Sequence, residues 1–478
     1  MREFIKNVGT VLPEIPKPEK KPTLNERFVW TGIALVAYLV MATTPLYGFS
    51  GTQANTQLSF LRVVFASTQG TLMELGIGPI VTAGLILQLL VGSDIIKLDM
   101  SDPDDRAIFG SATKLLTFIV IIGESFAYIY GGALGALGQT QALVVFVQLF
   151  IASVLVLLLD EMIQKGWGIG SGVSLFILAG VAQTFMWYTF SPITFALTTT
   201  QSAYFGFIPA TISAFFTNTL PSIVVREFKY PSLLTFSLTI VMILVLVYIE
   251  GIRVELPITS VKYRGFQGVY PIKLLYVSNI PVILVSALGA NITFFSRLLY
   301  NYTGSGPAPW WLNIIARFPT NSTAGSYPIG GIVYYMTPPQ GLSVTNGTGT
   351  INDPIHAIIY LLYLVGMSVL FARLWVEIGG LNPKAVAKNL MDADVQVPGF
   401  RRSGLSIEQM LNRYIPTLTI IGGILIGLIA GVSDLFGVFG TGIGILLMVD
   451  IILQYYQMLL KEQVEEVSPA LAGLIGAG

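Results

Sequence analysis

Ten mainly apolar stretches alternate with polar segments along this chain. A helix that crosses the hydrocarbon core of a bilayer needs about 17 to 25 apolar residues, and nine of the stretches reach that length. Their spacing predicts a helical chain that crosses a membrane ten times. The stretches are residues 28–47, 77–92, 115–133, 143–159, 173–190, 233–249, 277–295, 355–375, 415–432 and 435–459.

The second stretch is the short one. As a helix it would span roughly 24 Å, against a hydrocarbon core of about 30 Å. Gly76, Gly78 and Pro79 at its start prevent a helix from running straight in from upstream. Residues 52–70, just before it, have only a short apolar centre. Backbone that breaks at membrane depth persists only where protein or a water-filled cavity surrounds it, so we expect a pore here.

Composition narrows the class of protein further. Hydrophobic residues make up 53% of the 478 and charged residues only 11%, which is typical of a polytopic membrane protein. The chain has no Cys and one His, His356, which excludes disulfides, thiol catalysis and a multi-histidine metal site. Residues 1–27 are polar and lack the features of a cleaved signal peptide. We expect them to form a retained, disordered tail.

The Lys and Arg residues predict the orientation. An even number of spans puts both termini on one side, and cytoplasmic segments carry the excess of Lys and Arg. With the tails 1–27 and 461–478 inside, 21 of the 26 basic residues are cytoplasmic and 5 are external. We therefore expect both termini in the cytoplasm.

Ten spans divide into two groups of five, residues 28–230 and 231–460. Because the spans of the two groups run in opposite directions, the chain suggests an inverted repeat with its functional path at the interface. Residues 191–230 and 301–353 are expected to be external insertions. The second carries sequons at Asn301, Asn321 and Asn346, which are glycosylation acceptors if that side is extracellular or chance matches to a short motif.

Aliphatic residues recur with helical spacing at the glycine-rich starts of two spans. Ile77 and Val81 are four residues apart and share one helix face, as do Ile177 and Val181. Spacing alone favours ordinary packing of such pairs.

Four motifs favour a functional role for these aliphatic pairs over ordinary packing. Residues 74–90, 168–180, 256–273 and 276–281 resemble, in order and spacing, segments of the SecY family, the large subunit of the protein-conducting channel, in its archaeal type. The resemblance covers most of the chain and is weakest in the two insertions. It implies an all-α polytopic membrane protein of ten transmembrane helices, in two inverted five-helix halves around a central pore, with a short plug helix.

The resemblance also implies roles for individual residues. The pore ring would consist of Ile77, Val81, Ile177, Val181, Ile283 and Leu446. The plug, residues 52–72, would include Thr56, Leu58, Leu61, Arg62, Phe65 and Gln69. The lateral gate would include Thr82, Gln88, Glu124 and Asn291, and ribosome or partner docking would use Lys262, Arg264, Arg401 and Arg402.

Three positions need explanation. Gln69 stands where the family often has Arg, which removes an ion-pair partner for Glu124. An unpaired carboxylate inside a membrane is costly, so Glu124 needs another partner or must be neutral. Asp450 lies within the last span, and the sequence offers no account of it.

As implied by the resemblance, the chain needs no cofactor and sits in the plasma membrane. Its expected partners are SecE-like and beta-type small subunits, a ribosome, the signal recognition particle with its receptor, nascent secretory and membrane polypeptides, and membrane lipids. A nucleotide-binding P-loop is absent from the sequence, so energy for transport must come from elsewhere.

Two other classes of protein share parts of this sequence pattern. A secondary transporter shares broken helices and inverted repeats, but the break here is lined by aliphatic residues rather than by ionisable ones. An intramembrane hydrolase would need Ser171 and His356 together, and their expected positions at opposite ends of their spans oppose a catalytic pair.

Overall fold

The computed structural model describes most of the chain. The described residues are 12–20, 22–47, 65–93, 95–96, 98, 102–130, 134, 137–198, 201–226, 230–260, 267–302, 309–319, 328–339, 353–392, 395–396 and 404–467.

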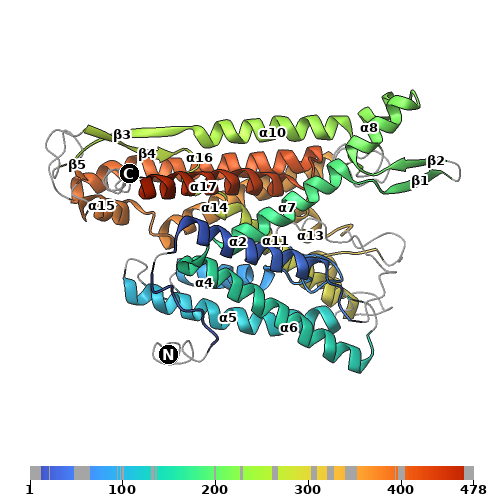
Figure 1. Ribbon diagram of the computed structural model, residues 1–478, viewed down its shortest axis with the longest axis horizontal. Coiled ribbons are helices and arrows are strands. Elements are labelled where there is room, and N and C mark those ends of the chain that lie inside the picture. Colours follow the sequence, from blue (N-terminus) through green and yellow to red (C-terminus); the bar gives the residue numbers. More distant parts are fainter. Residues whose placement is uncertain are drawn as a thin grey trace.

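In this described part, nine helices are long and apolar enough to cross a membrane. They run roughly along the long axis of the molecule (Figure 1). A tenth apolar helix, α4 (Gly78–Gly92), has 15 residues and is about 22 Å long. The predicted multi-pass helical architecture is confirmed, including its short second span. The nine long helices are α2 (Leu24–Thr43), α5 (Pro103–Tyr130), α6 (Gln139–Met162), α7 (Gly172–Phe190), α10 (Leu233–Gly251), α11 (Ile280–Tyr302), α14 (Pro354–Ile378), α16 (Gly404–Phe436) and α17 (Gly442–Val467).

Short strands and helices lie at the two ends of the helix bundle (Figure 1). At one end β3 (Arg253–Ser260) lies between β4 (Gln267–Lys273) and β5 (Val395–Gln396) in an antiparallel sheet, beside α15 (Pro383–Asp392). At the other end are the antiparallel pair β1 (Thr194–Thr198) and β2 (Gln201–Tyr204), followed by α8 (Phe207–Phe216) and α9 (Pro221–Val224). The remaining elements are η2 (Ile163–Trp167), α12 (Trp310–Ile315) and α13 (Ile332–Met336).

Close contact between α14 and α16 depends on glycine. A Cβ atom at Gly427 would lie 2.8 Å from the Val365 Cα, and one at Gly423 would lie 3.0 Å from the Val369 Cα. The two glycines are four residues apart and share one face of α16. Lipid is as apolar as a leucine side chain, so helices in a membrane associate through such close packing of small residues.

The last span begins later than its apolar pattern predicts. The stretch from residue 435 reads as continuous, but α16 continues to Phe436 and α17 starts at Gly442. Gly437 and Gly440 adopt positive φ between them, a conformation that glycine reaches without steric cost. The turn between α16 and α17 is therefore built from these two glycines.

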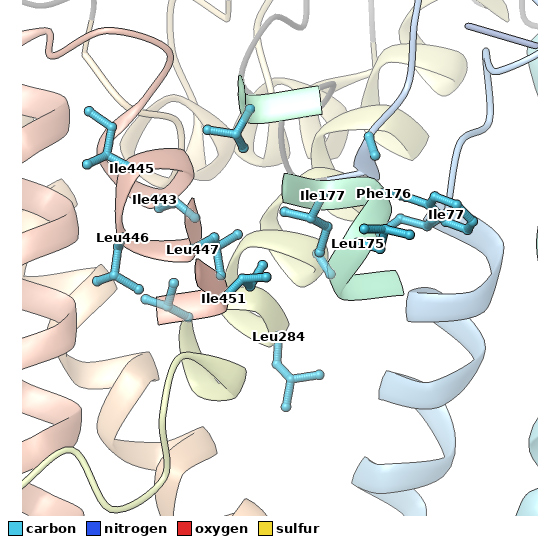
Figure 2. Packing of buried hydrophobic residues seen from close by; sticks show 14 of the residues in the cluster. Ile77, Leu175, Phe176, Ile177, Leu284, Ile443, Ile445, Leu446, Leu447 and Ile451 are labelled. Atoms are coloured by element: carbon cyan, nitrogen blue, oxygen red, sulfur yellow. The ribbon is translucent and has the colours of Figure 1, made fainter. Parts of the chain in front are cut away.

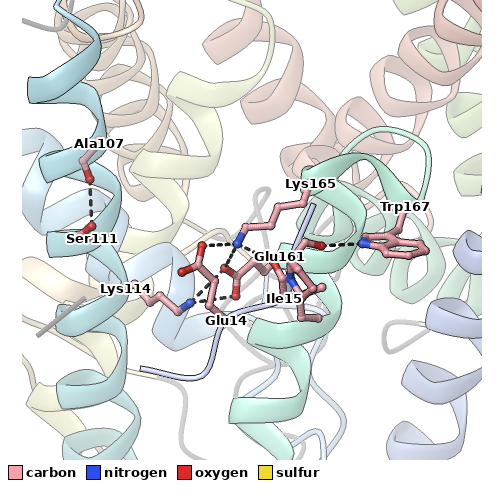
Figure 3. Close-up of polar contacts among 9 residues, drawn as sticks. Glu14, Ile15, Ala107, Ser111, Lys114, Glu161, Lys165 and Trp167 are labelled. Atoms are coloured by element: carbon pink, nitrogen blue, oxygen red, sulfur yellow. Dashed lines mark hydrogen bonds and ion pairs between the residues drawn. The ribbon is translucent and has the colours of Figure 1, made fainter. Parts of the chain in front are cut away.

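Residues 12–20, the N-terminal strap, pack against η2 (Figure 3). Lys165 Nζ forms an ion pair with the Glu14 carboxylate and donates to the Ile15 carbonyl at 2.6 Å. Trp167 Nε1 donates to the Pro16 carbonyl at 2.8 Å. Over these residues the chain is docked rather than disordered, because η2 supplies donors for its carbonyl groups.

The strap also joins a wider ion-pair network. Glu161 pairs with Lys165 at 2.9 Å and with Lys114 of α5 at 3.0 Å. The hydrogen bond from Lys165 lowers the pKa of the Glu14 carboxyl below its ordinary value. A lowered acid pKa in the folded state stabilises docking above the ordinary pKa, and this contribution disappears as pH falls through the folded-state value.

We predict that acid loosens the strap. A nitroxide on Pro18→Cys, in a chain with no other Cys, should be ordered at neutral pH and become more mobile as pH falls below the ordinary pKa of a glutamate. Glu14→Gln should give the mobile spectrum at neutral pH, and Glu19→Gln on the same strap should not. Because Glu14 is largely exposed, the ion pair contributes at most about 1 kcal/mol, so loosening is partial. A spectrum of the Glu14→Gln protein identical to wild type would contradict the prediction.

Candidate functional site

Three helices, α4, α7 and α17, start at buried glycine residues, Gly78, Gly172 and Gly442. The first N–H groups of a helix have no intrahelical partner, and such groups must be satisfied by protein in a membrane. Each of the three starts finds its partner in a segment that precedes it in the chain.

A carboxylate from the preceding helix caps α7. Asp160, near the end of α6, accepts from the Val173 N–H at 2.9 Å and also from the Gly172 N–H. A Cβ atom at Gly172 would lie 2.6 Å from the Asp160 Cα, so only glycine permits this approach. The negative charge also lies at the positive end of the helix dipole.

The start of α17 repeats this arrangement. Asp434, near the end of α16, accepts from the Gly442 N–H at 2.6 Å, and Tyr360 of α14 donates to its other oxygen at 2.7 Å. A Cβ atom at Gly442 would lie 2.2 Å from the Ala430 carbonyl oxygen. The starts of the fifth and tenth spans are thus glycine-dependent helix junctions of one type.

The start of α4 is held by the end of the predicted plug. Ile77 N–H donates to the Phe65 carbonyl at 2.8 Å, and Tyr38 of α2 donates to the Ala66 carbonyl at 3.1 Å. Gly76 has a φ of +56°, and a Cβ atom there would lie 2.1 Å from the Phe65 oxygen. The turn that leads into the short span therefore requires glycine.

Aliphatic side chains from the starts of these helices meet in one apolar cluster (Figure 2). Ile77, Ile177, Val181 and Leu446 are buried, and Val81 and Ile283 are partly buried against the same cluster. All six predicted ring residues therefore lie in one cluster, contributed by α4 and the turn before it, α7, α11 and α17.

Their directions within the cluster differ. Figure 2 shows Leu447 and Ile451 extending from α17 on the side of Ile177, whereas Leu446 extends from the opposite side of that helix. Leu447 is fully buried. Successive residues on a helix point about 100° apart, so the sequence stretch alone leaves the facing residue undecided.

Three of the four predicted gate residues form a hydrogen-bonded group. Asn291 Nδ2 of α11 donates to Thr82 Oγ1 of α4 at 3.0 Å, and Thr82 Oγ1 lies 3.3 Å from Glu124 Oε1 of α5. Glu124 thus has a hydroxyl partner where the family pattern suggested an Arg at position 69. Gln88 lies apart from this group, and its Oε1 has no hydrogen-bond partner among the described residues.

Asp450 belongs to a second polar group, which the sequence did not reveal. Its Oδ2 accepts from Ser278 Oγ at 2.6 Å and from Gln454 Nε2 at 2.7 Å. Its side chain is also hydrogen-bonded to Glu250, at the end of α10. Ser278 lies just before α11, so this group joins α17 to the ends of two other spans. Asp450 and Gln454 lie more than 170 residues after Glu250 and Ser278, and no local pattern connects the two pairs.

His356 and Ser171 have separate surroundings. His356 Nε2 lies 3.0 Å from the Thr337 carbonyl oxygen, and its ring stacks on Tyr334. Ser171 lies at the start of α7, where its carbonyl accepts from Tyr455 at 3.3 Å. Each residue therefore contacts its own local surroundings, and these contacts do not bring the two together as a catalytic pair would require.

Several predicted residues lie outside the described part of the chain. Among the plug residues, Phe65 and Gln69 are described. Those outside it are Thr56, Leu58, Leu61 and Arg62 of the plug and the docking residues Lys262, Arg264, Arg401 and Arg402.

Comparison with known proteins covers nearly the whole chain. The family model described as SecY matches residues 71–456, and the model described as the plug domain of Sec61p matches residues 36–70. A solved structure of a protein-conducting channel is 37% identical, with a TM-score of 0.82 over 97% of this chain and 98% of its own.

Two further solved structures are similar to the same extent. A SecY channel whose plug domain stabilises the closed state is 37% identical, with a TM-score of 0.79 over 97% of this chain and 98% of its own. Sec61 in a canine ribosome–channel complex from the endoplasmic reticulum is 36% identical, with a TM-score of 0.80 over the same shares. The chain therefore belongs to the SecY family of protein-conducting channels.

Proposed function

We propose that this chain is the central subunit of a translocation channel, which passes secretory polypeptides through an apolar ring and releases transmembrane segments sideways into lipid. The observation that carries this proposal is the convergence of aliphatic side chains from α4, α7, α11 and α17 at buried helix starts. Branched apolar side chains at a constriction exclude water and ions by dewetting. They hold no charge that would bind a passing chain.

The ring we propose keeps Ile77, Val81, Ile177, Val181 and Ile283. Leu447 takes the place given to Leu446, because it extends toward Ile177. Leu446 would then pack α17 against its neighbours. The plug would close the external side, which the contacts of Phe65 and Ala66 with the start of α4 and with α2 support.

The lateral gate we propose opens between α4 and α11. Separating these helices breaks the bond between Thr82 and Asn291 and turns both groups toward lipid. Hydrogen bonds between membrane helices contribute about 0.6 kcal/mol on average and up to about 1.7. The polar group would therefore bias the resting channel toward the closed state, and a hydrophobic signal would offset that bias.

In the proposed orientation the chain crosses the plasma membrane and both termini lie in the cytoplasm. The ion pair of Arg27, at the start of α2, with Glu462, near the end of α17, supports a shared side. SecE-like and beta-type subunits, the ribosome, and the signal recognition particle with its receptor would be partners. In the sequence, the docking candidates Lys262 and Arg264 lie between β3 and β4, and Arg401 and Arg402 follow β5. Cation contacts with ribosomal phosphates would weaken with salt.

Photo-crosslinking from Ile77 tests the channel directly. A photo-reactive residue at this position should crosslink to a ribosome-stalled nascent chain in membrane vesicles, and only when the chain carries a functional signal. The same residue at Ile151, on the exposed side of α6, should give no such crosslink. Failure at Ile77, together with uptake of a small solute by the purified protein, would favour a transporter instead.

Substitution of Ile283 by Asn should hydrate the ring. An amide without a partner in an apolar site costs about 1–3 kcal/mol, which favours the water-filled state by roughly five- to hundredfold. Resting ion conductance in planar bilayers should rise, and a precursor with a defective signal should be transported. Leu447→Asn should act in the same way, whereas Leu446→Asn should lower thermal stability without raising conductance. The reverse order for these two leucines would contradict the proposed ring.

Substitution of Asn291 by Asp should open the gate. An Asp carboxylate has no N–H to donate to Thr82 Oγ1, so the bond that joins α11 to α4 is lost, and we expect transport of a defective-signal precursor to rise about fivefold, or about 1 kcal/mol. Gln88→Glu adds the same charge to α4 outside the polar group and serves as the control. Equal effects of the two substitutions would argue against a specific role for the polar group.

A further inference from the structure

The first insertion presents a helix with one buried apolar face and one exposed apolar face. In α8, Phe207, Ala210 and Ala214 are buried and lie on one face. The Phe207 ring stacks on Phe236 of α10, with centroids 4.5 Å apart. The opposite face carries Ile212, Phe215 and Phe216, and the last two are 66% and 81% exposed. Residues 191–225 include no Asp, Glu, Lys or Arg.

This exposed face is firmly positioned. The Gly206 N–H donates to the Ser191 carbonyl at 3.0 Å, which joins the start of α8 to the end of α7. Arg226 donates to the carbonyls of Phe205 and Pro231, which joins the end of the insertion to the start of α10. With ten residues, α8 is about 15 Å long and cannot span a bilayer.

The surface around α8 indicates what covers it. Trp187 and Phe190, in the last turns of α7, and Leu233, at the start of α10, are exposed on spans that cross the membrane. The apolar face of α8 continues this lipid-facing surface beyond the ends of the two spans. Figure 1 shows α8 at that end of the bundle.

The second insertion presents the same kind of surface in the other half of the chain. In α12, Leu312 is fully buried, whereas Trp310 is 76% exposed and Trp311 and Ile314 are also exposed. The first turns of α14, which contacts α13 as α12 does, expose Ile355 and Ile358. Tryptophan and tyrosine concentrate where the hydrocarbon core meets the headgroups, because their rings have an apolar body and a polar edge.

We propose that α8 and α12 are interfacial anchors, which insert their aromatic side chains into one leaflet of the phospholipid bilayer, one anchor for each half of the channel. The occupant is lipid rather than a protein partner, because the exposed faces are uncharged and continue the lipid-facing sides of the spans. In the proposed orientation this is the outer leaflet. The anchors themselves do not depend on which side is outside.

Spin labelling of the reconstituted chain tests the proposal. The sequence has no Cys, so Phe216→Cys and Trp310→Cys each give one labelled site in phospholipid vesicles. Nitroxides in lipid collide with oxygen and are protected from a water-soluble nickel chelate, whereas nitroxides in water show the opposite. Leu244→Cys, on the exposed side of α10, supplies the lipid standard, and Glu19→Cys supplies the water standard.

Both labelled sites should give an oxygen-to-nickel collision ratio that shifts to the lipid standard. A ratio equal to the water standard would overturn the proposal. Protection from both reagents would also overturn it, because a protein surface would then cover the site. All labelled positions are exposed, so the substitutions leave packing intact. The crosslink at Ile77 is measured separately, so failure of the anchors is distinguishable from failure of the channel.

Discussion

Buried helix starts are the constraint on which the rest of this structure depends. Broken helices at membrane depth leave backbone N–H groups without water as a partner. The chain meets this requirement with Asp160 for α7, Asp434 for α17 and the Phe65 carbonyl for α4. Each partner approaches so closely that the adjoining position must be glycine, at Gly172, Gly442 and Gly76 respectively. The hydrogen bonds that satisfy these helix starts are therefore possible only because glycine occupies the adjoining positions.

The same arrangement, a carboxylate that caps a glycine-started helix, occurs once in each half of the chain, as an inverted repeat would require. Ser171, at the start of α7, contacts Tyr455 in the later part of α17, whereas Tyr188, near the end of α7, packs on Phe439 just before α17. The two helices consequently run antiparallel. Helices that start at opposite ends and carry aliphatic residues inward bring those residues together near the centre, where a ring can form.

In the described part of the chain, the polar groups around Thr82 and Asp450 connect helices to one another. Thr82 links α4, α5 and α11, and Asp450 links α17 to Glu250 and Ser278. In an apolar surrounding a fully satisfied network is specific, because every alternative arrangement leaves a polar group without a partner. The network around Thr82 can open only if those partners are replaced, which is what a gate requires.

The sequence by itself predicted the number of spans, the short second span and the residue types of the proposed ring, because hydrophobic length and glycine position are local properties. It also predicted that Glu124 needs a partner. Only the tertiary structure decided that Thr82 is this partner, that Leu447 rather than Leu446 extends toward Ile177, and that Asp450 meets Ser278 and Glu250. Contacts between residues far apart in the chain depend on how helices rotate and cross, and one-dimensional periodicity does not contain that information.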